Sequence, residues 1–188
     1  MKKNKNIKTG FTLIETIVAI SLFTIVILTS NSMFVMSQKI YKKGSALSEL
    51  SQNARISLDK ISRELRQSND LITDFSLIST SSEIFFQDGH DNNEITYIKY
   101  FASSTDLIRK NLAYEFSANP GVYVYYGSID AWGQPPDEIM LEERIVGEYF
   151  NTLEFSFSSS SGLVNIYINL NNTHADIKIN SKAHIRNW

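Results

Sequence analysis

A single carboxylate stands inside the apolar N-terminal part of this sequence. Across residues 11–36 the only charged side chain is Glu15. A carboxylate in an apolar membrane span costs about 2.5 to 3.5 kcal/mol on insertion scales unless something neutralises it. Glu15 therefore needs a positively charged partner, or it snorkels toward the headgroups near the start of the helix. The residues before the apolar run carry four positive charges, on Lys2, Lys3, Lys5 and Lys8.

The run that holds Glu15 is long enough to cross a membrane. It is dominated by Ile, Val, Leu, Phe and Ala, and a helix rises about 1.5 Å per residue against roughly 30 Å of hydrocarbon. Lysines on a short N-terminal tail favour a cytoplasmic N-terminus, which places the residues beyond Gln38 on the outer side. The run continues through residues 29–32 without an A-x-A cleavage site, so we expect the helix to be retained in the mature protein.

The stretch from Gly10 to Glu15 reads G-F-T-L-I-E and separates the basic leader from the apolar run. This arrangement resembles the class III signal of type IV pilin-like proteins, in which prepilin peptidase cuts after the glycine and methylates the new N-terminal residue. The resemblance implies cleavage between Gly10 and Phe11, with Phe11 N-methylated. It also implies that Glu15 pairs with the Phe11 ammonium of an adjacent subunit and sets the axial register of a filament. The ammonium of the same chain, four residues away on one helix face, is an alternative partner.

Length and composition predict one globular domain beyond the anchor. The chain has 188 residues, of which 43% are hydrophobic and 12% aromatic, enough for a packed core. Removing the four leader lysines from 18 Lys and Arg leaves 14 against 20 Asp and Glu, which takes the formal net charge from -2 to -6. This balance argues against a broad nucleic-acid-binding surface. The chain has no cysteine, so its fold depends on packing without disulfides.

A second periodic segment follows the apolar run. No proline interrupts residues 11–69, which predicts one continuous helix whose first half is membranous and whose second half packs an apolar face on a sheet. Charged residues, Glu64 among them, lie between the apolar ones. We expect a leader at 1–10, a transmembrane segment at 11–37, an amphipathic continuation at 38–70 and a β-rich headgroup at 71–188. The apolar residues recur at three- and four-residue steps, at Leu47, Leu50, Ala54, Leu58, Ile61 and Leu65.

After residue 69 the apolar period changes to two, which is typical of strands. The clearest hairpin joins residues 153–157 to 163–170 through a serine-rich turn. The fold class is therefore α+β, a pilin-like lollipop with a long N-terminal α-helix packed on a C-terminal antiparallel β-sheet headgroup. The expected strands are residues 83–87, 94–101, 107–112, 122–126, 139–144, 153–157, 163–170 and 177–185.

Residues that could bind a metal or act as nucleophiles form no recognisable set. The spacing of oxygen ligands around Gly89 does not match a calcium-binding D-x-[DN]-x-[DN]-G loop, and a solvated turn is the favoured interpretation. The histidines are scattered and no hydrolase or nucleotide-binding motif is present. We therefore expect no catalytic residue, no metal and no cofactor. The residues considered are Asp88, His90, Asp91, Asn93, Glu94, His174 and His184.

Residues 118–137 form the least regular part of the headgroup and are expected to be a variable loop. Aromatic side chains in and near strands are usually core residues, and we favour that interpretation here over an exposed binding patch. The aromatic residues in question are Tyr123, Tyr125, Tyr126 and Trp132.

A second resemblance covers the headgroup. The run A-R-I-S-L-D-K-I-S-R-E-L-R-Q at 54–67, the strand pair at 84–100 and A-H-I-R-N at 183–187 resemble minor pilins and pseudopilins of the W and J type. That class sits at or near the filament tip and helps to initiate assembly. The resemblance implies a minor pilin or pseudopilin of a type IV pilus, a type II secretion pseudopilus or a competence filament.

The alternative function is a membrane-tethered receptor or enzyme that uses the helix only as an anchor. Glu15 beside the Gly10-Phe11 junction, and the lack of a catalytic set, favour the assembly subunit. The implied partners are prepilin peptidase, other pilins or pseudopilins through the N-terminal helix, an inner-membrane assembly platform and membrane lipid, with no nucleic acid expected directly. The implied location is the cytoplasmic membrane, with the C-terminal domain periplasmic or extracellular.

Overall fold

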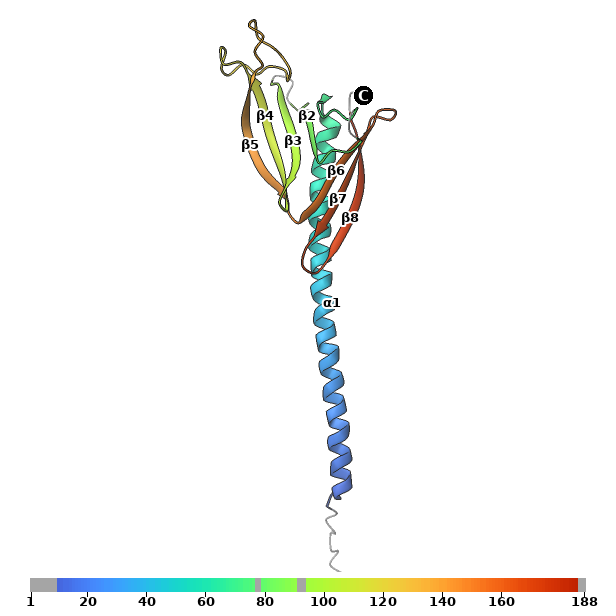
Figure 1. The fold of residues 1–188 in the computed structure, drawn as a ribbon. Coiled ribbons are helices and arrows are strands. Elements are labelled where there is room, and N and C mark those ends of the chain that lie inside the picture. Colours follow the sequence, from blue (N-terminus) through green and yellow to red (C-terminus); the bar gives the residue numbers. More distant parts are fainter. Residues whose placement is uncertain (1–9, 77–78, 91–93, 186–188) are drawn as a thin grey trace, which may run out of the picture. The chain divides into compact units, whose positions relative to one another are not determined.

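The structure is a computed structural model that describes residues 10–76, 79–90 and 94–185. The chain forms two compact units, Met1–Gly44 and Ser45–Trp188. The second unit is called the headgroup unit below. One helix, α1 (Leu13–Gln67), contributes to both units (Figure 1). The leader lysines and residues 91–93, which include Asp91 and Asn93, lie outside the described residues.

The part of α1 in the first unit is apolar and exposed. It contains an 18-residue window with a mean hydropathy of 2.2 and no buried residue, so its length and composition suffice to cross a membrane. Its hydroxyls donate to carbonyls four residues earlier, as from Thr24 Oγ1 to the Ile20 oxygen at 2.8 Å and from Ser32 Oγ to the Leu28 oxygen at 3.0 Å. Such bonds satisfy a hydroxyl where no water is present.

Two antiparallel sheets make up the rest of the headgroup unit, where the sequence predicted one. The first has the order β1-β2-β3-β4-β5 and the second the order β6-β7-β8 (Figure 1). A bridge between Ser81 and Phe155 links the segment before β2 to β6. The strands are β1 (Asp70–Leu71), β2 (Glu83–Gln87), β3 (Thr96–Ser103), β4 (Asp106–Glu115), β5 (Asp137–Gly147), β6 (Phe150–Ser158), β7 (Leu163–Asn171) and β8 (Asp176–His184).

The predicted hairpin is confirmed as β6 and β7, with Leu153 opposite Ile168 and Phe155 opposite Ile166. The turn between β7 and β8 is capped by Asn172, whose Oδ1 accepts the N–H groups of His174 and Ala175 at 3.0 and 2.9 Å. Asn171, Asn172 and Thr173, which fit the N-x-T form of a glycosylation sequon, thus lie at the end of β7 and in this hairpin turn.

The predicted strand at residues 122–126 is wrong. β5 occupies one edge of β4, and β3 occupies the other as far as Ala113. This segment is therefore left with one bridge, between Tyr123 and Glu115 at the end of β4. Glycines with positive φ stand on both sides of it, Gly121 at 84° and Gly127 at 77°, and such residues turn the chain. The segment belongs to a long loop between β4 and β5.

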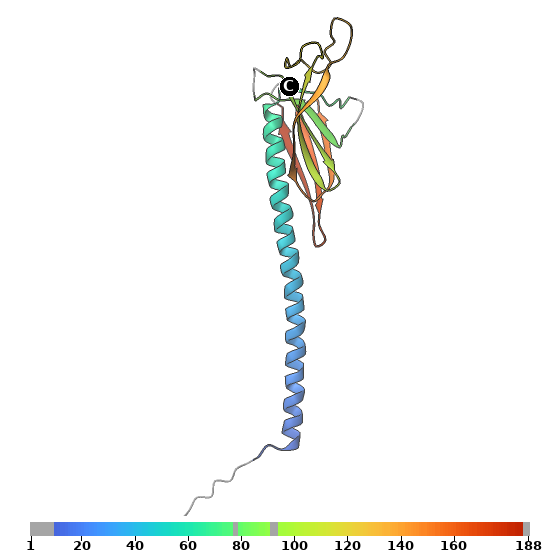
Figure 2. The same ribbon diagram turned by 90° about the vertical axis from the view of Figure 1, so that its left-hand side faces the viewer.

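The core lies between α1 and both sheets, and in the headgroup unit α1 runs beside the strands (Figure 2). The C-terminal end of β5 lies directly against α1. There is no room for a side chain at Gly147, since a Cβ atom added to it would lie 2.3 Å from Ser57 Oγ. Ser57 Oγ also donates to the Val146 carbonyl at 3.3 Å. The predicted helix stripe is buried at Leu50, Ala54, Leu58, Ile61 and Leu65, whereas Leu47 is exposed.

A buried charge cluster ties α1 to the first sheet. Glu64, which the periodicity placed among the polar positions, is only 7% exposed. Its carboxylate accepts Tyr100 Oη at 2.6 Å and Arg109 Nε at 3.1 and 3.0 Å, and Arg109 Nη1 reaches Glu142 Oε2 at 3.5 Å. We call Glu64, Tyr100, Arg109 and Glu142 the Glu64 cluster.

The electrostatics of the Glu64 cluster follow from its burial. Burial raises the pKa of Tyr100, and the adjacent Glu64 carboxylate raises it further. Burial alone would lower the pKa of Arg109, but its hydrogen bond and charge interaction with Glu64 outweigh this and raise it. Tyr100 therefore stays a neutral donor and Arg109 a cation, which leaves the Glu64 carboxylate paired.

Candidate functional site

The first described residues, Gly10, Phe11 and Thr12, precede α1 and are exposed. Phe11 is 89% exposed. A Cβ added to Gly10 would meet no described atom within 4 Å. The Gly10–Phe11 peptide bond is thus unobstructed by the described chain, and packing in this fold does not require a glycine at position 10.

Thr12 and Glu15 form a capping box at the start of α1. The Thr12 N–H and Oγ1 both donate to Glu15 Oε2 at 2.8 Å, and the Glu15 N–H donates to Thr12 Oγ1 at 3.3 Å. In a capping box the N-cap threonine and the glutamate three residues later satisfy each other's free N–H groups. Glu15 therefore has a partner in the uncleaved chain without any ammonium.

This role of Thr12 was not among the predictions from the sequence. Its signal was present as T-x-x-E at residues 12–15, directly before an apolar helix. Both Thr12 donors bind Oε2, and within the described residues Oε1 of Glu15 has no hydrogen bond. One carboxylate oxygen can thus close the helix start while the other receives a further cation.

The residues considered for metal binding come together only in part. His90 Nδ1 lies 3.4 Å from Asp88 Oδ1, and the same oxygen accepts the His90 N–H at 3.0 Å. Among the described residues no three His, Cys, Asp or Glu side chains form a possible metal site. The Asp88–His90 pair is part of a turn, in which a Cβ on Gly89 would lie 2.0 Å from the Gln67 carbonyl oxygen.

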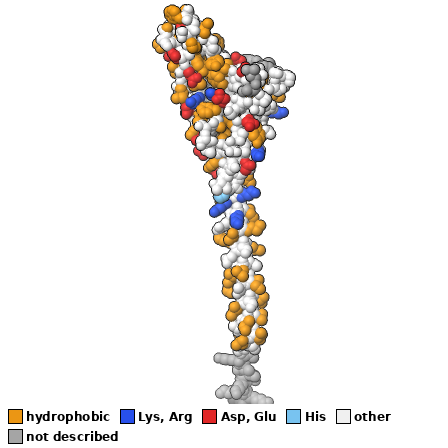
Figure 3. All heavy atoms as spheres, viewed as in Figure 1, with side chains coloured by type: hydrophobic (Ala, Val, Ile, Leu, Met, Phe, Trp, Pro, Cys, Tyr) orange, Lys and Arg blue, Asp and Glu red, His pale blue; other side chains and the backbone are white. Residues whose placement is uncertain are grey.

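The loop between β4 and β5, residues 116–136, is called the aromatic loop here. The expectation that its aromatic residues lie in the core is wrong for Trp132 and Tyr125, which are 76% and 59% exposed. Tyr126 packs against Phe85, Tyr97 and other rings, but half of it is also exposed. Figure 3 shows hydrophobic side chains gathered over this end of the headgroup unit. Sequence periodicity cannot distinguish an aromatic residue in a loop from one in the core here. A short apolar run next to a strand has the same pattern in both cases.

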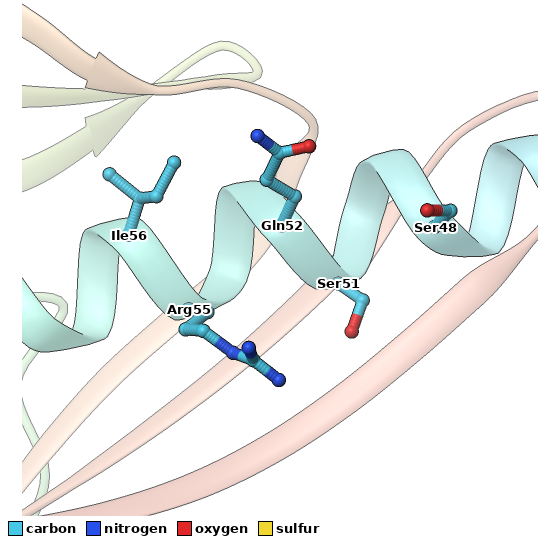
Figure 4. Close-up of a pocket in the computed structure, with 5 residues that line it drawn as sticks. All are labelled: Ser48, Ser51, Gln52, Arg55 and Ile56. Carbon is cyan, nitrogen blue, oxygen red and sulfur yellow. The ribbon is translucent and has the colours of Figure 1, made fainter.

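The free side of α1 in the headgroup unit carries a shallow hollow, called the α1 hollow below (Figure 4). Its lining combines hydroxyl and amide groups with one guanidinium and one branched aliphatic side chain, which are exposed or half-buried. The residues that line it are Ser48, Ser51, Gln52, Arg55 and Ile56.

The N-terminal residues match a known family. The prokaryotic N-terminal methylation motif covers residues 5–30, which include Gly10, Phe11 and Glu15. No curated protein and no solved structure matches the chain significantly. Together with the long apolar helix and the antiparallel sheets, this motif supports a type IV pilin-like protein with a class III signal. The motif implies processing by prepilin peptidase and assembly with other pilins, and with the apolar helix it supports membrane anchoring.

Proposed function

We propose that the protein is a minor, assembly-initiating subunit of a type IV pilus, a type II secretion pseudopilus or a competence filament, and not an enzyme. The observation that carries this proposal is the Gly10–Phe11 junction followed by Glu15 in the first turn of an exposed apolar helix. A simple anchor would use Glu15 only to cap its first turn, which glutamine does without a charge. It would gain nothing from the negative charge, which makes insertion harder by about 2.5 to 3.5 kcal/mol when no cation pairs with it.

The minor, initiating role is supported by the headgroup. The run at residues 54–67 resembles W- and J-type subunits, and the headgroup unit extends from Ser45 to Trp188, which is large for a subunit that forms a filament shaft. In this proposal the N-terminus is cytoplasmic and the headgroup unit is periplasmic or extracellular.

Processing would convert the helix start into an assembly site. Cleavage after Gly10 leaves the Phe11 ammonium next to Thr12, at the N-terminal end of the helix, which is the positive end of the helix dipole. The Glu15 carboxylate is the only negative side chain in this apolar part of the chain. Pairing of Glu15 with the ammonium of a neighbouring subunit neutralises both groups and fixes the axial register.

The cleavage site can be tested at Gly10. Replacing Gly10 by leucine should leave a full-length, membrane-inserted precursor, because the peptidase requires a small residue before the cut. A leucine at position 10 should not disturb the fold, since an added Cβ there meets no described atom within 4 Å. Loss of cleavage would therefore reflect recognition by the peptidase. Gly44→Ala is the control, because Gly44 also lies in open space. Intact mass reads the outcome, and a native mature chain that begins elsewhere than Phe11 would contradict the assignment.

The minor role predicts a low stoichiometry with a strong phenotype. Deleting the protein should sharply reduce the number of filaments, although it contributes few copies to those that form. Quantitative proteomics of sheared filaments and counting by electron microscopy measure both quantities. Abundance near that of the major pilin would reject the minor role, and unchanged filament numbers would reject the initiating role.

A further inference from the structure

We propose that the aromatic loop of one copy docks onto the α1 hollow of a second copy of this chain. This inference rests on the proposed function, because it names a contact between subunits of the same filament. An initiating subunit needs only a few copies in contact, so a self-contact is compatible with a minor role. Each half of the contact is visible in the headgroup unit.

Hydrogen bonds brace the aromatic loop, while several of its apolar side chains, Tyr125 and Trp132 among them, are exposed. Asp130 Oδ1 accepts the N–H groups of Trp132 and Gln134 at 2.9 and 2.7 Å. The Asp130 N–H donates to the Gln134 carbonyl at 3.0 Å, and the Tyr126 N–H donates to the Tyr97 hydroxyl at 2.8 Å. A prearranged loop loses little entropy on binding. Exposed Trp and Tyr side chains are also the types that most often dominate interface energies.

The charges around the loop point to a cationic partner. Residues 115–138 contain no Lys, Arg or His, and in the described part of the chain none of their carboxylates forms an ion pair. A guanidinium can stack on an indole ring and is attracted by nearby carboxylates. The carboxylates are Glu115, Asp130, Asp137 and Glu138.

The free side of α1 offers the complementary surface. Arg55 lines the α1 hollow. Arg63 and Arg66 are exposed further along the helix, and the exposed Asp59 lies between Arg55 and Arg63. In Figure 4 Arg55 and Ser51 project from one side of α1 and Gln52 and Ile56 from the other, so a ring seated between them would meet a guanidinium on one flank and an apolar side chain on the other.

The two surfaces lie at opposite ends of the headgroup unit in both ribbon views (Figures 1 and 2). A copy therefore cannot close the contact on itself, and the contact between two copies is head-to-tail. Subunits of a filament are displaced along its axis, which allows the loop of one to reach the helix of another.

Cysteine cross-linking tests the contact, because the natural chain has no cysteine. Two differently tagged full-length chains, one with Ala131→Cys and one with Gln52→Cys, are mixed in detergent, where copies can shift freely past one another, and treated with a short bis-maleimide. A mixed-tag adduct is expected. Ser160→Cys, in the exposed turn between β6 and β7, replaces Ala131→Cys in the control pair.

Trp132→Ala or Arg55→Glu should lower the adduct by about tenfold or more, as expected for a dominant interface residue. Both side chains are exposed, so neither change removes core packing, and protease resistance verifies the fold. Adduct at the level of the control pair, or adduct unchanged by Trp132→Ala, overturns the proposal. A shift of tryptophan emission with neutral oligosaccharide, in a Trp188→Phe background and without the adduct, would assign the loop to a carbohydrate and also overturn it.

The result is separable from the proposed function. If the adduct forms but deletion leaves filaments unchanged, the contact stands and the filament role fails. If filaments depend on the protein but the adduct stays at the control level, the filament role stands and the contact fails.

Discussion

Replacing Glu15 by leucine should abolish the ability of the protein to restore filaments in a deletion strain, although the variant is cleaved, inserted and folded. Insertion itself becomes easier without the carboxylate, by up to about 2.5 to 3.5 kcal/mol. Assembly fails because a neighbour's Phe11 ammonium is left unpaired in a low-dielectric bundle. Breaking such a buried pair costs about 3 to 5 kcal/mol. Immunoblotting of sheared filaments and cross-linking to partner pilins measure the loss.

The capping box allows the charge of Glu15 to be separated from its role in helix capping. Glu15→Gln keeps a T-x-x-Q capping box but cannot neutralise an ammonium, whereas Thr12→Ala removes the cap and keeps the charge. Loss of a cap costs only about 0.5 to 2 kcal/mol. We therefore expect Glu15→Gln to fail like Glu15→Leu, Glu15→Asp to be intermediate, and Thr12→Ala to assemble. Normal filaments with Glu15→Gln would show that the charge does not set the register.

Replacing Arg109 by methionine should destabilise the headgroup unit by about 3 to 5 kcal/mol, because it leaves the Glu64 carboxylate buried without its cation. The side chains of Glu64 and Arg109 are only 9% and 11% exposed. Methionine keeps much of the volume of arginine, so lost charge and not lost packing dominates. Denaturant unfolding of the detergent-solubilised chain, followed by near-UV circular dichroism, measures the change.

Arg144→Met is the matched control for Arg109. Arg144 pairs with Glu142, but its side chain is 63% exposed, and exposed ion pairs contribute about 0 to 1 kcal/mol. Combining Arg109→Met with Glu64→Gln should recover part of the stability, since no buried charge then remains. An Arg109→Met variant as stable as the Arg144→Met variant would mean that the Glu64 cluster does not hold α1 to the sheet.

Local pattern predicted most of the elements of this fold. Steps of three and four residues predicted a continuous helix, observed as Leu13–Gln67, and alternation predicted the β6–β7 hairpin. Both patterns reflect the same cause, because an element with one buried face repeats its apolar residues with its own period. The segment at 122–126 was misread, since its apolar residues face solvent or neighbouring rings and its pairing with a strand is limited to one bridge from Tyr123 to Glu115.

The sequence by itself determined how α1 begins, because Thr12 and Glu15 bind each other across only three positions of the chain. The capping box was written as T-x-x-E. Only the tertiary structure decided that Glu64 meets Arg109 and Tyr100, which lie 45 and 36 residues away. It also decided that Trp132 faces solvent. Whether such a side chain is buried depends on which distant strands cover it. The local spacing of apolar residues carries no information about those strands.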